Sequence, residues 1–147
     1  MSGPSDDNTG VVPTTLECRL EAIDAARKMV ADLEIRGVMS PHERHVLELI
    51  IEELVTNTLK HGGCGPNSTI ELRITFSGDA LGLHYQDHGR PFDPLRDLPP
   101  DSRDRHIDER QLGGLGWPLI FHYANDVSYS RESSVNRISI RVPRFAA

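Results

Sequence analysis

The feature that most constrains this chain is a long run with helical spacing of apolar residues, HVLELIIEELVTNTLKHGG at residues 45–63. Glu53, Asn57 and His61 are four residues apart within it, so at about 100° per residue they share one strip of a helix. Aliphatic residues flank that strip, and the opposite side carries Arg44, Glu48 and Glu52. We therefore expect the polar strip to face the interior.

A polar strip that faces the interior needs partners. Leaving an amide or carboxylate unpaired among aliphatic side chains costs roughly 2–7 kcal/mol, and more for a full charge. A bound metal or ligand would supply the pairing, and so would a neighbouring strand or loop that these side chains cap. On the helix alone, both interpretations stand.

The ends of two helices can be read from the sequence. Ser40 is placed as an N-cap, with Pro41 in the first turn and Glu43 completing a capping box, so the polar strip lies on a helix that begins there. Gly62-Gly63 ends that helix. An earlier helix follows the apolar spacing of residues 20–33 and stops at Gly37.

Alternating apolar residues predict the strands. A first strand is expected at residues 14–20, and two hairpins at 70–85 and 127–142, with a short helix at 115–123 before the second hairpin. The order is strand, two helices, two strands, loop, helix, two strands. This order predicts the α+β class, as a two-layer sandwich with helices on one face of a mostly antiparallel mixed sheet.

The chain of 147 residues has the size of one domain. Residues 1–13 are rich in Gly, Pro, Ser and Asp and are expected to form a disordered tail, which leaves 14–147 as the domain. Residues 93–112 contain prolines and many charges without apolar periodicity. A loop of that length is typically a lid, a binding loop or a disordered segment, and we expect a lid.

Composition excludes some classes of function. The net charge of −6 argues against direct binding to nucleic acid or to an anionic membrane, because both repel an acidic surface. No uncharged apolar run reaches about 18 residues, and the N-terminus lacks a signal-peptide pattern, so we expect a soluble, cytoplasmic protein. Cys18 and Cys64 are too few and too far apart to indicate a disulfide framework or a CxxC metal site, which favours a reducing compartment.

Two further motifs lie between the first predicted hairpin and the short helix. Asp87-His88-Gly89-Arg90-Pro91-Phe92 follows the first hairpin, and Gly113-Gly114-Leu115-Gly116 stands before the helix. A glycine lets a ligand approach the backbone closely, and free N–H groups at a helix start can face phosphate oxygens. In isolation, Asp87 is equally typical of a turn, and the glycines of a plain Gly-rich turn.

In combination, these motifs resemble a known set. Glu53-Leu54-Val55-Thr56-Asn57 with His61 resembles the N-box, Asp87-His88-Gly89 the G1 box and Gly114-Leu115-Gly116 the G2 box of ATPases of the gyrase, Hsp90, histidine-kinase and MutL superfamily. The short length, the GGLG-x-x-LI form and the closing pair of strands are most similar to bacterial anti-sigma factor serine/threonine kinases. The similarity covers about residues 14–144 and implies a Bergerat-type ATP-binding fold.

The resemblance implies ATP and Mg²⁺ as cofactors and gives each motif residue a role. Asn57 would be the metal ligand, through the hard oxygen that Mg²⁺ prefers, and Glu53 the general base. Asp87 would accept a hydrogen bond from the adenine amino group. Further nucleotide contacts are implied for Lys60, His61, Gly89, Phe92, Arg105, Gly113, Gly114, Leu115 and Gly116.

The bland alternatives stay open at several of these positions. Glu53 could be a buried structural carboxylate, and Lys60 and His61 a solvated helix end. The arginines of residues 93–112, including Arg105, could belong to an ordinary solvated loop.

The chain departs from the family pattern at two places. It also lacks the sequence motifs of several other enzyme classes. Trp117-Pro118 stands where the family has a small or aliphatic pair, and the Trp would crowd the phosphate end or pack on a partner. Pro91 replaces a second glycine of the G1 box. No GxSxG or P-loop motif is present, and the two histidine pairs, His42 with His45 and His84 with His88, lack a third metal ligand.

Two classes of function remain. The first is a serine/threonine kinase that phosphorylates a STAS-fold anti-sigma antagonist and sequesters a sigma factor or an equivalent target, with a homodimer as an open possibility. The second is a non-catalytic module that keeps the ATP-binding fold only to sequester its partner. The presence of Glu53 favours the kinase, because a pure binder does not need a base.

Overall fold

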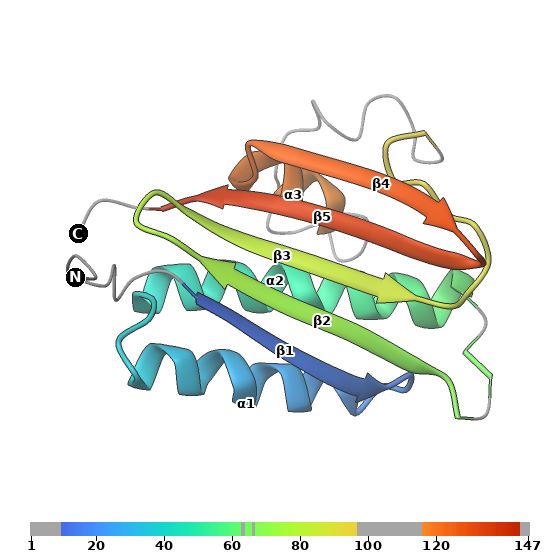
Figure 1. Ribbon diagram of the computed structural model, residues 1–147, viewed down its shortest axis with the longest axis horizontal. Helices are drawn as coiled ribbons and strands as arrows, with labels where there is room; N and C mark the ends of the chain where they lie inside the picture. The colour runs from blue at the N-terminus through green and yellow to red at the C-terminus, as the bar shows by residue number, and fades with distance from the viewer. Residues whose placement is uncertain (1–9, 63, 66, 97–115, 145–147) are drawn as a thin grey trace, which may run out of the picture.

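The computed structural model describes residues 10–62, 64–65, 67–96 and 116–144. In this part of the chain a five-stranded sheet forms one layer and the helices cover one of its faces (Figure 1). The strand order is β1-β2-β3-β5-β4, and every pairing is antiparallel. The predicted α+β sandwich is confirmed. The described strands contain no hydrogen-bonded parallel pair of the expected mixed sheet: β4 runs parallel to β3, but β5 lies between them and is antiparallel to both.

The strands are β1 (Gly10–Glu17), β2 (Thr69–Phe76), β3 (Ala80–Asp87), β4 (Asp126–Glu132) and β5 (Val135–Pro143). The pairs β2–β3 and β4–β5 are the two predicted hairpins. At the second turn Ser133 and Ser134 both have positive φ, 53° and 65°, which matches the right-handed twist of the strands that they join. β3 lies in the middle of the sheet, and its last residue, Asp87, pairs with Asn136 of β5.

The helices are α1 (Ala22–Ile35), α2 (Pro41–Asn57) and α3 (Gly116–Tyr123), with a π-helical turn, η1 (Thr58–Gly62), directly after α2. The capping box at the start of α2 is confirmed: Glu43 N donates to Ser40 Oγ at 3.1 Å, and Ser40 N donates to Glu43 Oε1 at 2.9 Å. The helical run ends at Gly62 as predicted, but its last turn is wider than an α-helix. Such π turns occur often at functional sites.

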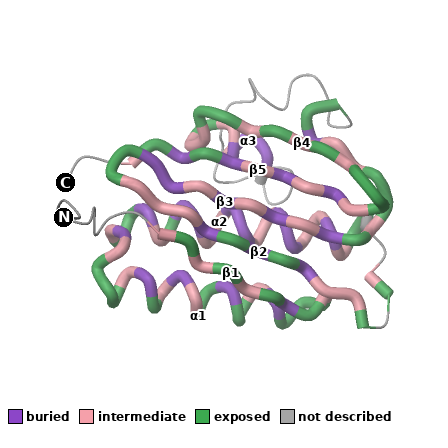
Figure 2. The backbone as a smooth tube through the Cα atoms, viewed as in Figure 1, coloured by how far each residue is buried: buried purple, intermediate pink, exposed green. Residues whose placement is uncertain are grey.

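One hydrophobic core lies between the sheet and the helices, and the purple segments of Figure 2 mark where the backbone carries buried residues. From α2 it contains Val46, Ile50 and Leu54, all at most 1% exposed. The sheet contributes the inward side of its alternating pattern, including Leu72, Leu83 and Ile140. The apolar residues that recur with helical spacing in the helices therefore pack against the apolar residues that alternate along the strands, and together they form one core.

The start of α2 is fixed to the end of the sheet by an ion pair between the partly buried Arg144 and the buried carboxylate of Glu43. Arg144 donates from Nε to Glu43 Oε2 and from Nη2 to Glu43 Oε1, both at 3.0 Å. Its guanidinium also donates to the carbonyls of Val38, at 2.7 Å, and Ser77, at 3.0 Å. The buried carboxylate of α2 is therefore Glu43, a residue that the sequence pattern assigns only to the cap.

Two expectations about the N-terminal region are wrong. β1 begins at Gly10, four residues before the expected strand, and ends at Glu17. Pro13 does not stop it because β1 is an edge strand, where a missing N–H leaves no central ladder incomplete. Leu20, which we expected to start the first helix, lies before α1 and is 67% exposed. Residues 1–9 of the predicted tail lie outside the described part.

Cys18 and Cys64 form a disulfide, contrary to the expectation of two unpaired cysteines. Their Cα atoms are 5.7 Å apart although 46 positions separate them in sequence. The reason is the pairing of β1 with β2, which brings the end of β1 to the segment that follows η1. The Cys18 N–H accordingly donates to Ser68 O at 2.9 Å.

Candidate functional site

A small cavity of about 20 Å³ lies where α2, η1, β3, β5 and α3 meet. Four of the predicted site residues line it: Asn57, His61, Asp87 and Phe92. The other lining residues are Leu54, Thr58, Arg90, Trp117, Asn136 and Ile138. The N-box-like helix and the G1-like turn thus both line one space.

Asp87 ends β3 with a buried side chain that is held on both oxygens. Oδ1 accepts from Gly89 N at 2.9 Å and from Asn136 Nδ2 at 2.8 Å. The bond to Gly89 is a turn of the kind that we considered as the alternative role of Asp87. Oδ2 accepts only from Thr58 Oγ1, at 2.9 Å, among the described residues. Because a carboxylate oxygen has two acceptor positions, Oδ2 can take one more donor.

Thr58 orients Asp87 through a chain of hydroxyl groups. Its Oγ1 lies 2.6 Å from Tyr85 Oη and 2.9 Å from Asp87 Oδ2. A hydroxyl carries one proton and a carboxylate only accepts, so Tyr85 donates to Thr58 and Thr58 donates to Asp87. Tyr85 is 1% exposed, and burial raises the pKa of its hydroxyl, which keeps it a donor.

Asn136 supports Asp87 from the neighbouring strand. Besides its bond to Asp87, Asn136 Nδ2 donates to Arg90 O at 2.8 Å. Its Oδ1 accepts from Tyr129 Oη at 2.6 Å and from Arg131 Nη1 at 2.9 Å, and the same Nη1 donates to Gly89 O at 2.9 Å. The turn after β3 is therefore fixed by side chains of β4 and β5.

Glu53 does not line the cavity, but it lies one helical turn before Asn57. It is half-buried, and this burial raises its pKa, while the charge of Lys60 opposes the shift and that of Glu52 adds to it. The Asn57 amide also favours the charged form slightly, although its Nδ2 makes no hydrogen bond of ordinary geometry. Burial is therefore the main cause of the raised pKa of Glu53. A carboxyl with a raised pKa fits a general base better than an exposed one does.

The polar strip on α2 and η1 faces the interior only in part. Glu53 and Asn57 are half-buried, but His61 is exposed because the π turn rotates the end of the helix outward. The His61 ring stacks on Phe92 with centroids 5.2 Å apart and an interplanar angle of 6°. The two rings form one rim of the cavity. Lys60 is exposed and does not line the cavity.

The glycine motif before α3 is only partly visible. Gly116 is the first residue of α3, and Trp117, the next residue, is buried and lines the cavity. Arg105, Gly113, Gly114 and Leu115 lie outside the described residues, as does most of the expected lid.

Sequence reasoning missed Thr58 and Asn136 as site residues. A signal for Thr58 was present, since it lies four residues after Leu54 on the buried side of the helix. Asn136 could not be found in this way, because its place opposite Asp87 depends on the pairing of β3 with β5 across a long connection.

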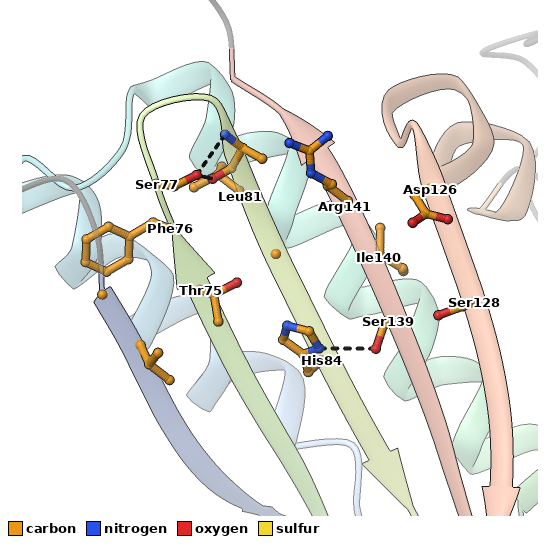
Figure 3. Close-up of a pocket in the computed structure, with 14 residues that line it drawn as sticks. Thr75, Phe76, Ser77, Leu81, His84, Asp126, Ser128, Ser139, Ile140 and Arg141 are labelled. Atoms are coloured by element: carbon orange, nitrogen blue, oxygen red, sulfur yellow. Dashed lines mark hydrogen bonds between the residues drawn. The ribbon is translucent and has the colours of Figure 1, made fainter. Parts of the chain in front are cut away.

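A larger hollow, of about 470 Å³, lies on the face of the sheet that the helices leave open (Figure 3). Gly82 opens it, because a Cβ at that position would clash with Thr75. His84 and Ser139 stand beside it, with His84 Nδ1 3.1 Å from Ser139 Oγ, and burial together with the charge of Arg73 lowers the pKa of His84. None of the predicted site residues lines this hollow, so we assign the candidate site to the smaller cavity.

Metal binding by protein side chains alone finds no support in the described part of the chain, where no three His, Cys, Asp or Glu side chains gather. A site that takes most of its oxygens from phosphate and water fits better, because Mg²⁺ usually needs only one or two protein ligands. Asn57 offers one such oxygen.

None of the described helices is long and apolar enough to span a membrane.

A family model for the histidine kinase-like ATPase domain matches residues 16–142. The chain belongs to the histidine kinase-like ATPase domain family. That match includes all the residues of the cavity, so the walls formed by α2, η1 and β3 are parts of the ATPase domain itself.

Relatives of this ATPase domain include named kinases. Serine/threonine-protein kinase BtrW of Bordetella bronchiseptica is 28% identical over 129 residues, which are 86% of this chain and 90% of BtrW. Serine-protein kinase RsbW of Bacillus licheniformis is 29% identical over 94 residues, 60% of this chain and 58% of RsbW. The RsbU and RsbW domains of Rv1364c from Mycobacterium tuberculosis match in structure with a TM-score of 0.61 and 12% identity, over 95% of this chain and 34% of that one. That likeness supports the fold alone, and this chain spans about a third of that protein.

Proposed function

We propose that this chain is an ATP-dependent serine/threonine protein kinase that acts as an anti-sigma factor in a cytoplasmic partner switch. The observation that carries the proposal is the arrangement around one cavity. Asp87 keeps one acceptor position, Asn57 lines the same cavity, and Glu53 lies one turn before Asn57. The kinase names of BtrW and RsbW support the same activity.

Adenine recognition would be the task of Asp87. Its Oδ2 accepts from Thr58 and has one free position, which suits the exocyclic amino group of adenine. Thr58, Asn136 and the Gly89 N–H fix the carboxylate before the nucleotide arrives, so little reorganisation is needed on binding. The stacked rings of His61 and Phe92 would close one side of the nucleotide.

Phosphate transfer would depend on Asn57 and Glu53. Asn57 would hold Mg²⁺, which neutralises phosphate charge when it is bound. Glu53 would accept the proton of a serine or threonine hydroxyl as that oxygen attacks the γ-phosphorus and the bond to the ADP oxygen breaks. Lys60 is close enough to lower the pKa of Glu53, and its charge is available to the phosphates.

The substrate would be a STAS-fold antagonist, and the sequestered partner a sigma factor or an equivalent target. A phosphate adds roughly 1.5–2 negative charges, and this chain carries a net charge of −6, so the phosphorylated antagonist should bind more weakly. The kinase would then be released for its second partner.

A non-catalytic sequestering module is the second candidate. The specific observation that favours it is the size of the cavity, about 20 Å³, with the indole of Trp117 among its walls. A space of that size holds about one water molecule and no adenine until it opens.

Affinity purification tests the proposal. The tagged protein is incubated with an extract of its native cell in the presence of Mg-ATP or Mg-ADP, and the captured partners are identified. Each purified partner is then mixed with fresh protein and ATP labelled at the γ-phosphate. Label on a serine or threonine of one partner is the expected result. Nucleotide-dependent capture without any labelled partner would favour the sequestering module.

A further inference from the structure

We infer that the indole N–H of Trp117 is a phosphate-recognising donor of the nucleotide site, which makes affinity depend on the phosphate chain. The inference rests on the proposed ATP-binding function and assigns a specificity-determining residue to it.

The first observation is an unpaired buried donor. Trp117 is 3% exposed, and its Nε1 is buried without a hydrogen-bond partner. A buried donor without an acceptor costs about 1–3 kcal/mol, so an acceptor that arrives with a ligand would remove a real penalty.

The second observation is where the unpaired donors gather. Among the described residues, three buried side-chain nitrogens lack a hydrogen-bond partner: Arg44 Nε, Asn57 Nδ2 and Trp117 Nε1. Arg44 does not line the cavity, and its Nε is in fact 3.1 Å from Glu34 Oε1 in an ion pair. The other two belong to side chains that line the same small cavity from different elements, α2 and α3. Two unpaired donors around one space indicate a ligand rich in acceptors.

The polarity of the cavity indicates which part of a nucleotide meets Trp117. Asp87 supplies an acceptor on one wall, which suits the adenine amino group and repels phosphate. Trp117 lies in the first turn of α3, where the unsatisfied backbone N–H groups and the helix dipole favour an anion. By their chemistry, phosphate oxygens therefore match the Trp117 donor, and the adenine amino group matches the Asp87 acceptor.

The size of the cavity predicts that Trp117 changes its surroundings on binding. A volume of about 20 Å³ accepts no phosphate group without movement, so the residues that line it, Trp117 among them, must rearrange as the ligand enters. The Trp117 ring packs against Phe121 with centroids 5.9 Å apart, so a rearrangement around Trp117 changes the environment of the indole. Because the chain has one tryptophan, its fluorescence reports on this residue alone.

Trp117→Phe tests the donor, because it keeps an aromatic ring and removes the N–H. Tyr123→Phe is the matched control, since it removes a polar atom from the same helix at a residue that does not line the cavity. Calorimetry with adenosine, ADP and Mg-ATP should show ADP and ATP affinity reduced about tenfold or more in Trp117→Phe, as for loss of a hydrogen bond to a charged group. Adenosine affinity should stay unchanged, and Tyr123→Phe should match the parent throughout.

Unchanged ADP and ATP affinity in a folded Trp117→Phe protein would overturn the inference, and so would an equal loss for adenosine. Inorganic pyrophosphate provides an arm that needs no variant: its addition to the parent should shift or quench the tryptophan emission. Absence of any response to pyrophosphate overturns the inference even if Trp117→Phe fails to fold. Failure of the parent to bind adenosine, ADP and ATP alike would instead overturn the proposed function, which the pyrophosphate response does not address.

Discussion

Arg144→Met should be one of the most destabilising single substitutions in this chain. It removes both hydrogen bonds to the Glu43 carboxylate, whose side chain is 3% exposed, and both bonds to the carbonyls of Val38 and Ser77. Breaking a buried ion pair from one side costs about 3–5 kcal/mol, because the remaining charge stays buried. A chain of this size would lose about 6–20 °C in its unfolding midpoint.

Urea unfolding followed by circular dichroism measures this cost. Arg27→Met is the matched control, since Arg27 pairs with Glu52 at 2.9 Å but both side chains are nearly half exposed. Exposed pairs contribute about 0–1 kcal/mol, so the control should lie close to the parent. Equal, small losses in the two variants would refute the reasoning that burial makes the Arg144 pair strong.

The same pair predicts a pH dependence. Burial alone would raise the pKa of Glu43, but the hydrogen bonds and charge of Arg144, with the Ser40 N–H, hold it below its usual range. The stabilisation is therefore present above the unfolded-state pKa, about 4.3, and is lost as pH falls through the lower folded-state pKa. The parent should lose stability in acid over this window, and Arg144→Met should lose less.

Three other substitutions test separate parts of the structure. Thr58→Val removes the hydroxyl that orients Asp87 and should weaken adenine nucleotide binding about tenfold by calorimetry; parental affinity would mean that Asp87 needs no such support. Glu53→Gln should stabilise the fold in urea at pH 8, because burial raises the Glu53 pKa and so penalises its charged form, and this gain should shrink as pH falls through the raised pKa; an equal gain at low pH would contradict the shift. The non-reduced protein should show no free thiol until the Cys18–Cys64 bond is reduced, and Cys18→Ser should cost roughly 2–4 kcal/mol; two titratable thiols before reduction would contradict the pairing.

The sequence was most informative where local rules apply. The capping box at Ser40, the end of the helical run at Gly62 and the two hairpins all depend on residues that are near one another in the chain, and each is confirmed. Clustering of Asn57, His61 and Asp87 followed from matching ordered motifs to a family, and these residues do line one cavity. Their roles in ATP binding stay predictions.

Features that depend on long-range pairing could not be read in the same way. The register of β3 with β5 places Asn136 beside Asp87, and the pairing of β1 with β2 brings Cys18 to Cys64. The prediction that Glu53, Asn57 and His61 all face the interior is wrong for His61, which is exposed. A helical projection assumes regular α-helical turns, whereas Thr58–Gly62 form a π turn.

The central claim is that Glu53 serves as the base of a protein kinase. Glu53→Gln keeps the size of the side chain but cannot accept a proton, and loss of a general base typically lowers a rate by about 10²–10⁴-fold. The most direct measurement follows γ-phosphate transfer from Mg-ATP to the purified antagonist in single-turnover reactions of the parent and Glu53→Gln. The account predicts transfer by the parent and a slowing of at least about a hundredfold in the variant, with Mg-ATP affinity close to that of the parent. Transfer by the variant at the parental rate, or no transfer by the parent to the antagonist that it binds, would contradict it.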